Sequence, residues 1–124
     1  MIYGIGCDLI KISRIQRAFS DEIKLSRCFT EKEIQLFDGR GERIAGNFAA
    51  KEAVAKALGT GFRGFSLKDI EILRDELGRP FMTADSLKDV LTKLKINDRL
   101  KVHLSISHEK EFAMATCMIE RVKL

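Results

Sequence analysis

Hydrophobic and polar residues alternate along this chain with periods that change from strand-like to helix-like and back. Residues 2–8, apolar with two glycines, read as a strand that ends at Asp8. Apolar residues then recur at helical spacing over 12–19. Thr30 and Glu33 stand three apart, the capping-box pattern that begins a second helix.

A longer, alanine-rich helix is predicted over residues 42–58, where Gly59-Thr60-Gly61 stops it. The rest of the chain reads as a hairpin, a helix and a second hairpin: strands around 70–72 and 79–82, a helix over 87–94, and strands over 101–107 and 112–121. This order predicts an α+β fold, with a largely antiparallel sheet packed on helices in one domain over residues 1–124.

The composition is that of a folded protein. Hydrophobic residues make up 45% and charged residues 32% of the 124 residues, and this balance differs from that of an intrinsically disordered chain. The apolar runs are too short for a membrane span, and the first residues lack the basic and apolar regions of a secretory signal. Three scattered cysteines without a Cys-x-x-Cys pair indicate reduced thiols. We therefore expect a cytoplasmic protein with no membrane partner.

The net charge of +4 is compatible with an anionic partner but does not identify one. Acidic and basic residues are interleaved, and one tyrosine with no tryptophan leaves few side chains on which bases would stack. Nucleic acid is therefore disfavoured as a partner.

Glu52 and Lys56 are the most informative charged residues, because they lie four apart on one side of an otherwise apolar helix. On an exposed surface such a pair is ordinary and contributes only about 0.2–0.5 kcal/mol. Among alanines, uncompensated charges are costly, which favours a cation beside Glu52 and an anion beside Lys56.

Asp8 alone is a weak signal, because an aspartate after a strand is more often a turn former or a helix cap. Together with Glu52 and Lys56 it completes a set suited to Mg²⁺, which takes one or two protein carboxylates and is otherwise bound by water and substrate phosphates. The three residues point to phosphoryl chemistry.

The chain also carries four longer motifs: Gly4-Ile5-Gly6-x-Asp8 with Arg14-Ile15, Phe29-Thr30-x-x-Glu33, the segment from Phe48 to Gly61, and Leu104-Ser105-Ile106-Ser107-His108. In this order, and over nearly the whole chain, they resemble the holo-[acyl-carrier-protein] synthases, the single-domain bacterial type of 4′-phosphopantetheinyl transferase. The resemblance implies that family's fold. It also implies Mg²⁺-dependent transfer of 4′-phosphopantetheine from coenzyme A to a serine of apo acyl carrier protein, releasing adenosine 3′,5′-bisphosphate, for fatty acid biosynthesis.

The same resemblance assigns roles to single residues. Asp8 and Glu52 are the implied magnesium ligands, and Lys56 is an implied contact to a coenzyme A phosphate, so these three form the catalytic set. The general base stays open between Glu52 and a metal-bound water.

Further coenzyme A contacts are implied at Gly59, Thr60 and Gly61 and at Ser107 and His108. An ordinary glycine helix end explains Gly59-Thr60-Gly61 equally well. Without the resemblance, nothing distinguishes His108 from His103.

Position 47 departs from the family pattern. The family often has an arginine directly before the Phe-Ala-Ala-Lys-Glu-Ala segment, where this chain has Asn47. An asparagine cannot hold a phosphate with two parallel bonds as an arginine does. Arg43 or Arg40 is the expected substitute.

Arg14 lies in the region that docks the acidic carrier protein in this family, and a basic enzyme suits electrostatic steering of that partner. The resemblance also implies a homotrimer with active sites between subunits, which gives a small domain the walls needed around a long cofactor.

Two other functions remain as alternatives. A non-catalytic module that binds a polyanion would need clustered Lys and Arg, and has no use for carboxylates beside its ligand. An enzyme with the same metal site but another phosphoanhydride substrate is distinguished only by assay.

Overall fold

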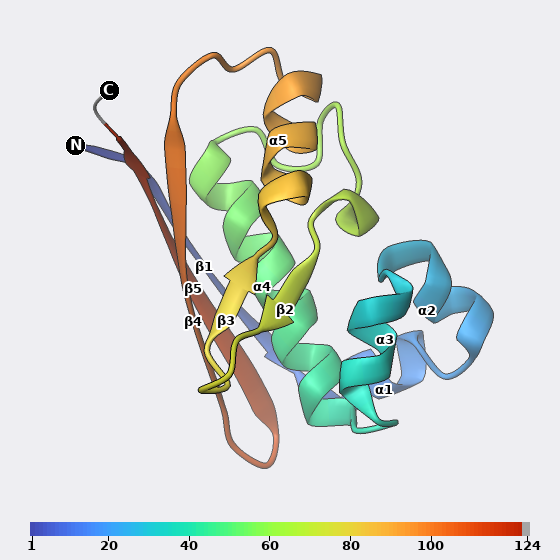
Figure 1. Cartoon of the computed structure of the whole chain (residues 1–124). Helices are drawn as coiled ribbons and strands as arrows, with labels where there is room; N and C mark the ends of the chain where they lie inside the picture. Colours follow the sequence, from blue (N-terminus) through green and yellow to red (C-terminus); the bar gives the residue numbers. More distant parts are fainter. Residues whose placement is uncertain (123–124) are drawn as a thin grey trace.

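Helix α4 (Gly41–Leu58) crosses one face of a three-stranded antiparallel sheet in the computed structural model, which describes residues 1–122 (Figure 1). The sheet has the order β1-β5-β4, from strands Ile2–Lys11, Phe112–Arg121 and Leu100–His108. A second antiparallel sheet pairs β2 (Ile72–Arg74) with β3 (Pro80–Met82). The other helices are α1 (Ile12–Ala18), α2 (Glu22–Cys28), α3 (Glu31–Phe37) and α5 (Ala84–Lys93), with a short 3₁₀ turn, η1, over Leu67–Asp69.

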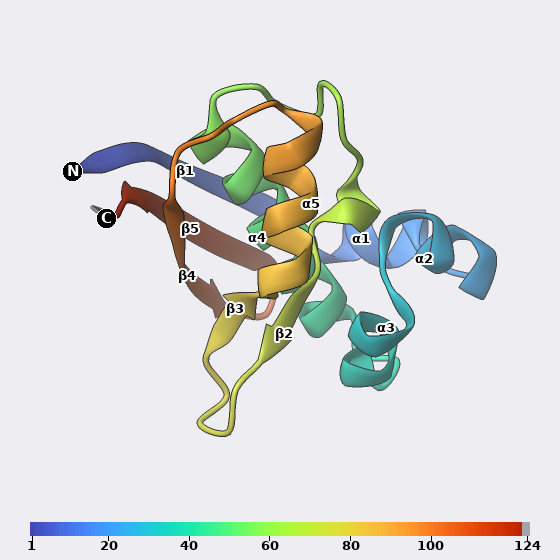
Figure 2. The same ribbon diagram turned by 45° about the horizontal axis from the view of Figure 1, so that its top comes forward.

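The helices lie on the same side of the three-stranded sheet (Figure 1), and α1, α2 and α3 gather near one end of α4 (Figure 2). Strand β5 shows why one face is covered. Its alternate residues Ala113, Ala115, Cys117 and Ile119 are buried against α4, whereas the residues between them are exposed. The outer face of the sheet is therefore open, and it carries large apolar side chains: Ile5, Leu9, Phe112, Met114 and Met118.

Two glycines allow β1 and α4 to come together. A Cβ on Gly4 would collide with the carbonyl oxygen of Ala57, and a Cβ on Gly6 would collide with that of Ala53. With no side chains at these two positions, the backbone of the strand lies directly against the helix. This contact sets the position of every residue on the neighbouring part of β1 relative to α4.

The other side of α4 is held by a buried ion pair. Lys51 and Glu33 are both 0% exposed, and Lys51 Nζ lies 2.8 Å from Glu33 Oε1. Lys51 Nζ also donates to the carbonyls of Cys28, Leu67 and Ile70 at 3.0, 2.9 and 2.6 Å. One ammonium thus ties α4 to the end of α2, to α3 and to the turn that precedes β2.

Glu33 completes the network from the carboxylate side. Its oxygens accept from the Thr30 amide at 2.9 Å, from Asn47 Nδ2 at 2.8 Å and from the Ile72 amide at 3.0 Å. Burial is the main influence on both charges: it raises the pKa of Glu33 and lowers that of Lys51, and their attraction opposes each shift. A buried pair with this many partners is compensated, and each member depends on the other.

The predicted α+β class and the antiparallel pairing are confirmed, with three local differences. Strand β1 continues to Lys11, because its end pairs with the start of β5 at Phe112, so Asp8 lies within the strand and not at its exit. The sequence pattern did not indicate α2, a seven-residue helix that buries no residue fully and packs only Leu25 and Cys28 partly against the core. Ile70 lies before β2 and gives its carbonyl to Lys51.

All three cysteines are free thiols, as the sequence predicted. Burial raises the pKa of Cys117 to about 12, so this thiol stays protonated and unreactive. In the described part of the chain, no helix has both the length and the apolar character to cross a membrane.

We predict that Lys51→Met lowers the free energy of unfolding by about 3–5 kcal/mol, because it leaves the Glu33 carboxylate buried without its cation. The matched control is Lys24→Met, which removes an exposed lysine whose Nζ lies 4.0 Å from Asp21; it should cost less than about 1 kcal/mol. Urea unfolding of the two variants measures both. Similar small losses would show that the buried pair does not hold the helices together.

Candidate active site

The structure brings Asp8, Glu52 and Lys56 together where β1 passes α4. Lys56 Nζ donates to Asp8 Oδ1 at 3.2 Å and to the carbonyl oxygen of Cys7 at 2.9 Å. Asp8 faces the helix because it shares the inner face of β1 with Gly4 and Gly6, whose missing side chains let the two elements approach. Residues that are 44 and 48 positions apart in the sequence thus meet at one edge of the sheet.

The two carboxylates influence each other. Partial burial raises the pKa of Glu52, the negative charge of Asp8 raises it further, and Lys56 lowers it. Two carboxylates that repel each other in a partly desolvated position form a site where a cation is favourable.

The donor set fits a magnesium ion that is bound together with a phosphate-bearing substrate. Within residues 1–122, no group of three or more histidine, cysteine, aspartate or glutamate side chains is placed to hold a metal ion. A closed zinc site requires about four protein ligands, whereas Mg²⁺ needs only one or two carboxylates and keeps water or phosphate in its other positions. Asp8 and Glu52 match the second case.

The Gly59-Thr60-Gly61 turn follows Lys56 directly at the end of α4. The Gly59 amide donates to the Lys56 carbonyl at 3.0 Å with φ at 82°, so ending the helix accounts for this glycine. Nothing lies within 4 Å of the position that a Cβ would take at Gly59 or Gly61. The turn therefore presents an open surface beside Lys56.

Ser107 and His108 lie at the end of β4, on the opposite edge of the sheet. As neighbours in a strand they point to opposite faces: Ser107 to the outer face, with Ser105, and His108 to the face on which α4 packs. Strand β5 separates β4 from β1 and hence His108 from Asp8. Within one chain, the predicted site residues form two groups and not one.

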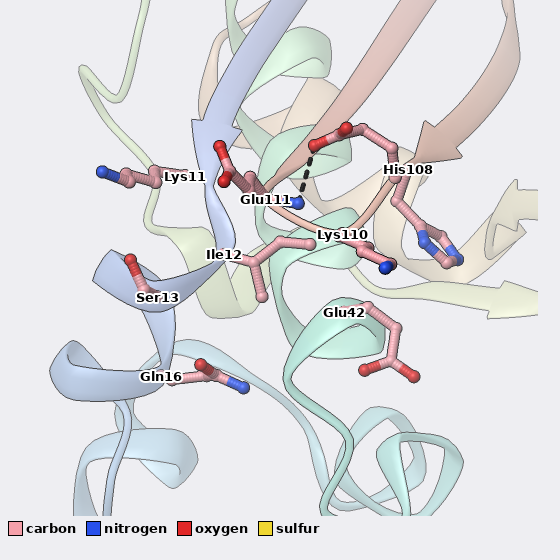
Figure 3. A pocket seen from close by; sticks show the side chains of 9 residues that line it. Lys11, Ile12, Ser13, Gln16, Glu42, His108, Lys110 and Glu111 are labelled. Atoms are coloured by element: carbon pink, nitrogen blue, oxygen red, sulfur yellow. Dashed lines mark hydrogen bonds between the residues drawn. The ribbon is translucent and has the colours of Figure 1, made fainter.

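His108 lines two cavities. The first, of about 670 Å³, lies between the start of α1 and the β4–β5 turn. Figure 3 shows Lys11, Ser13 and Gln16 on one side of it and His108 with Glu42 on the other. Lysines and glutamates both line this cavity, which gives it no clear preference for one sign of charge.

The second cavity, of about 450 Å³, has a more distinct character, because Arg43 and Arg74 line it together with His108. Arg43 donates to the carbonyl of Leu36 at 3.0 Å, and Arg74 donates to that of Gly78 at 3.3 Å. Among the described residues, no carboxylate lies within 4.0 Å of either guanidinium. Arginines paired only with carbonyls, around one hollow, are suited to an anion.

The pKa of Arg74 is consistent with an anion-binding cavity. Although Arg74 is exposed on β2, partial desolvation of its guanidinium lowers its pKa, and the positive charge of Arg43 lowers it further. A bound anion would relieve that repulsion.

Asn47 lines the same cavity, but its amide group is directed into the core. It is almost fully buried and donates to Glu33 and to the carbonyl of Ile72. Of the two expected substitutes for an arginine at this position, Arg43 reaches the cavity, whereas Arg40 does not line it and lies 3.4 Å from Glu42. Arg74 could not be identified from the sequence, because only the folded hairpin brings β2 beside α4.

Arg14 is exposed on α1, whose opposite side buries Ile12 and Ile15. Arg17, one turn further along the helix, is exposed as well. These two arginines form a basic surface on α1, which lies near the N-terminal end of α4.

Comparisons with known proteins agree on one family. Residues 4–117 match the family model of the 4′-phosphopantetheinyl transferase superfamily. The chain is 51% identical over 126 residues to a holo-[acyl-carrier-protein] synthase from Clostridium perfringens, with 97% of this chain and 95% of that protein covered.

Solved structures are similar over the same length. A holo-(acyl-carrier-protein) synthase from Bacillus anthracis in complex with CoA (3′,5′-ADP) has a TM-score of 0.80 and 38% identity, with 98% of this chain and 99% of that chain covered. A holo-[acyl-carrier-protein] synthase from Helicobacter pylori in complex with coenzyme A has a TM-score of 0.79 and 30% identity, with 94% and 99% covered.

Proposed function

The chain belongs to the 4′-phosphopantetheinyl transferase superfamily as an enzyme of the holo-[acyl-carrier-protein] synthase type, and we propose that it transfers 4′-phosphopantetheine from coenzyme A to a serine of apo acyl carrier protein. We propose further that the reaction requires Mg²⁺, releases adenosine 3′,5′-bisphosphate and serves fatty acid biosynthesis in the cytoplasm. The observation that carries the proposal is the meeting of Asp8, Glu52 and Lys56 at one edge of the sheet.

In the proposed reaction, Asp8 and Glu52 would hold the magnesium ion, which when bound would offset the charge of the pyrophosphate. Lys56 adds a mobile positive group that binds a phosphate oxygen of the donor. The serine oxygen forms a bond to the phosphorus of the phosphopantetheine arm while the bond from that phosphorus to the bridging oxygen breaks. The electron pair leaves with adenosine 3′,5′-bisphosphate, and the serine proton passes to Glu52 or to water.

We propose that the second cavity binds the adenosine end of coenzyme A. Arg43, Arg74 and His108 offer positive and hydrogen-bonding groups for its 3′-phosphate, and the two arginines would replace the family arginine missing at Asn47. The Gly59-Thr60-Gly61 turn would contact the pyrophosphate next to Lys56, and Ser107 would contribute from the end of β4.

These two groups of residues lie on opposite edges of one sheet, with β5 between them and α4 packed across the same face, which favours a donor molecule that contacts both groups where two chains meet. The open outer face of the sheet supports such an assembly, because its exposed apolar residues become buried when copies pack together. We propose a homotrimer in which each active site takes Asp8, Glu52 and Lys56 from one subunit and His108 from its neighbour.

The acidic carrier protein would dock on the basic surface of α1. Arg14 is exposed and, among the described residues, lies more than 4.0 Å from any carboxylate, so its charge is available to a partner. Such contacts raise the association rate and weaken at high salt.

The transfer is tested by incubating the protein with coenzyme A, Mg²⁺ and an apo acyl carrier protein and measuring the intact mass of the carrier. We expect the mass to rise by one phosphopantetheine, and we expect excess chelator to stop the reaction.

Glu52→Gln should lower kcat by about 100-fold or more, because the amide keeps the shape of the carboxylate and loses its charge. Glu76→Gln, at the exposed β2–β3 turn, is the matched control and should leave the rate unchanged.

Full turnover in chelator would contradict the metal requirement. A well-folded Glu52→Gln enzyme with the rate of Glu76→Gln would remove Glu52 from the mechanism.

Docking is tested by Arg14→Glu, which we expect to raise the KM for the carrier about tenfold while changing the KM for coenzyme A less than twofold. Lys88→Glu, the same charge reversal on the exposed face of α5, is the control. If both KM values rise together in Arg14→Glu, the residue shapes the active site and does not dock the carrier.

The shared site is tested by mixing inactive subunits. When Asp8→Ala and His108→Ala chains are unfolded together and refolded, random assembly should restore about one quarter of the sites of a trimer. Asp8→Ala mixed with Glu52→Gln is the matched control and should recover no activity, because both residues belong to the same subunit's half of the site. A fully active monomer in sedimentation would contradict the proposal.

A further inference from the structure

Asp8 already has a cation beside it. Lys56 Nζ lies 3.2 Å from Asp8 Oδ1, while the Asp8 side chain is 16% exposed and that of Lys56 is 53% exposed. The carboxylate is therefore largely shielded from water, whereas much of the lysine remains in solvent. The attraction between these charges is stronger than that of a fully exposed pair.

The proposed reaction assigns different partners to both groups. Asp8 is to bind a divalent cation, and Lys56 is to bind a phosphate of the donor. An ammonium held at Oδ1 competes electrostatically with a metal ion for the same carboxylate, because each repels the other at close range.

The two groups differ in how easily they can change partner. Asp8 is fixed within β1, which Gly4 and Gly6 hold against α4. Lys56 has a flexible four-carbon side chain, and its second bond, to the Cys7 carbonyl, also lies at the exposed edge of the sheet. Lys56 is therefore the group that moves.

We propose that Lys56 and the divalent cation exchange at Asp8: the lysine weakens cation binding to the free enzyme, and the donor phosphate draws the lysine away so that cation and donor bind cooperatively. This inference rests on the proposed function and adds to it a coupling between the two ligands. Lys56 thus acts twice, first as a competitor of the cation and then as a phosphate contact.

The test is the affinity of Mn²⁺, a probe for the magnesium site, measured by isothermal titration calorimetry without a carrier protein. Lys56→Met should bind Mn²⁺ about three- to tenfold tighter than the unaltered protein, since the competing ammonium is gone. Lys88→Met removes the same charge from the exposed face of α5 and should leave the affinity unchanged. Adding Asp8→Asn to Lys56→Met should abolish the gain.

A second titration measures the coupling. Saturating coenzyme A should raise the Mn²⁺ affinity of the unaltered protein by a larger factor than that of Lys56→Met, because only the former has a lysine to displace. Lys56→Gln repeats both titrations if the methionine variant does not give the cooperative urea transition of the unaltered protein.

Equal Mn²⁺ affinities for Lys56→Met and Lys88→Met would overturn the exchange. So would an equal increase in Mn²⁺ affinity, on adding coenzyme A, for the unaltered protein and Lys56→Met. Neither titration depends on transfer, so a failed carrier assay would count against the proposed function alone.

Discussion

The close contact between β1 and α4 is the constraint on which the candidate site depends. Gly4 and Gly6 leave no side chains between strand and helix, and their carbonyl neighbours on α4 would collide with any Cβ. Asp8 follows on the same face of β1 and so meets Glu52 and Lys56. On the other side of α4, the buried Lys51–Glu33 pair fixes the helix against α3 and the chain before β2. The helix is held from two directions, and Glu52 and Lys56 lie on the side that faces the strand.

Sequence reasoning could predict the parts of this arrangement that are local or periodic. The glycine-bearing strand, the capping box at Thr30, the long alanine-rich helix and the two hairpins all have patterns of their own. Asp8, Glu52 and Lys56 were identified as one set from their chemistry and from a family resemblance, and the structure places them together. Helix α2 has only the Asp21 cap as a local signal. None of its residues is fully buried, so a clear periodic pattern is missing.

Contacts that depend on the folded topology could not be found in this way. Lys51 stood out in the sequence only as part of the motif from Phe48 to Gly61, and only the fold reveals its buried partners. Arg74 reaches the cavity beside Arg43 because the β2–β3 hairpin lies alongside α4. The strand order β1-β5-β4 separates Asp8 from His108 within one chain, and only the fold shows this separation. That separation supports the proposal of an active site shared between chains.

The central claim, that one donor molecule bridges two subunits, is tested most directly by a crystal structure of the protein with coenzyme A and Mg²⁺. The account predicts the pyrophosphate beside Asp8, Glu52 and Lys56 of one chain, with the adenosine 3′-phosphate against Arg43, Arg74 and His108 of another. Coenzyme A bound wholly within one chain, or away from both groups, would contradict it.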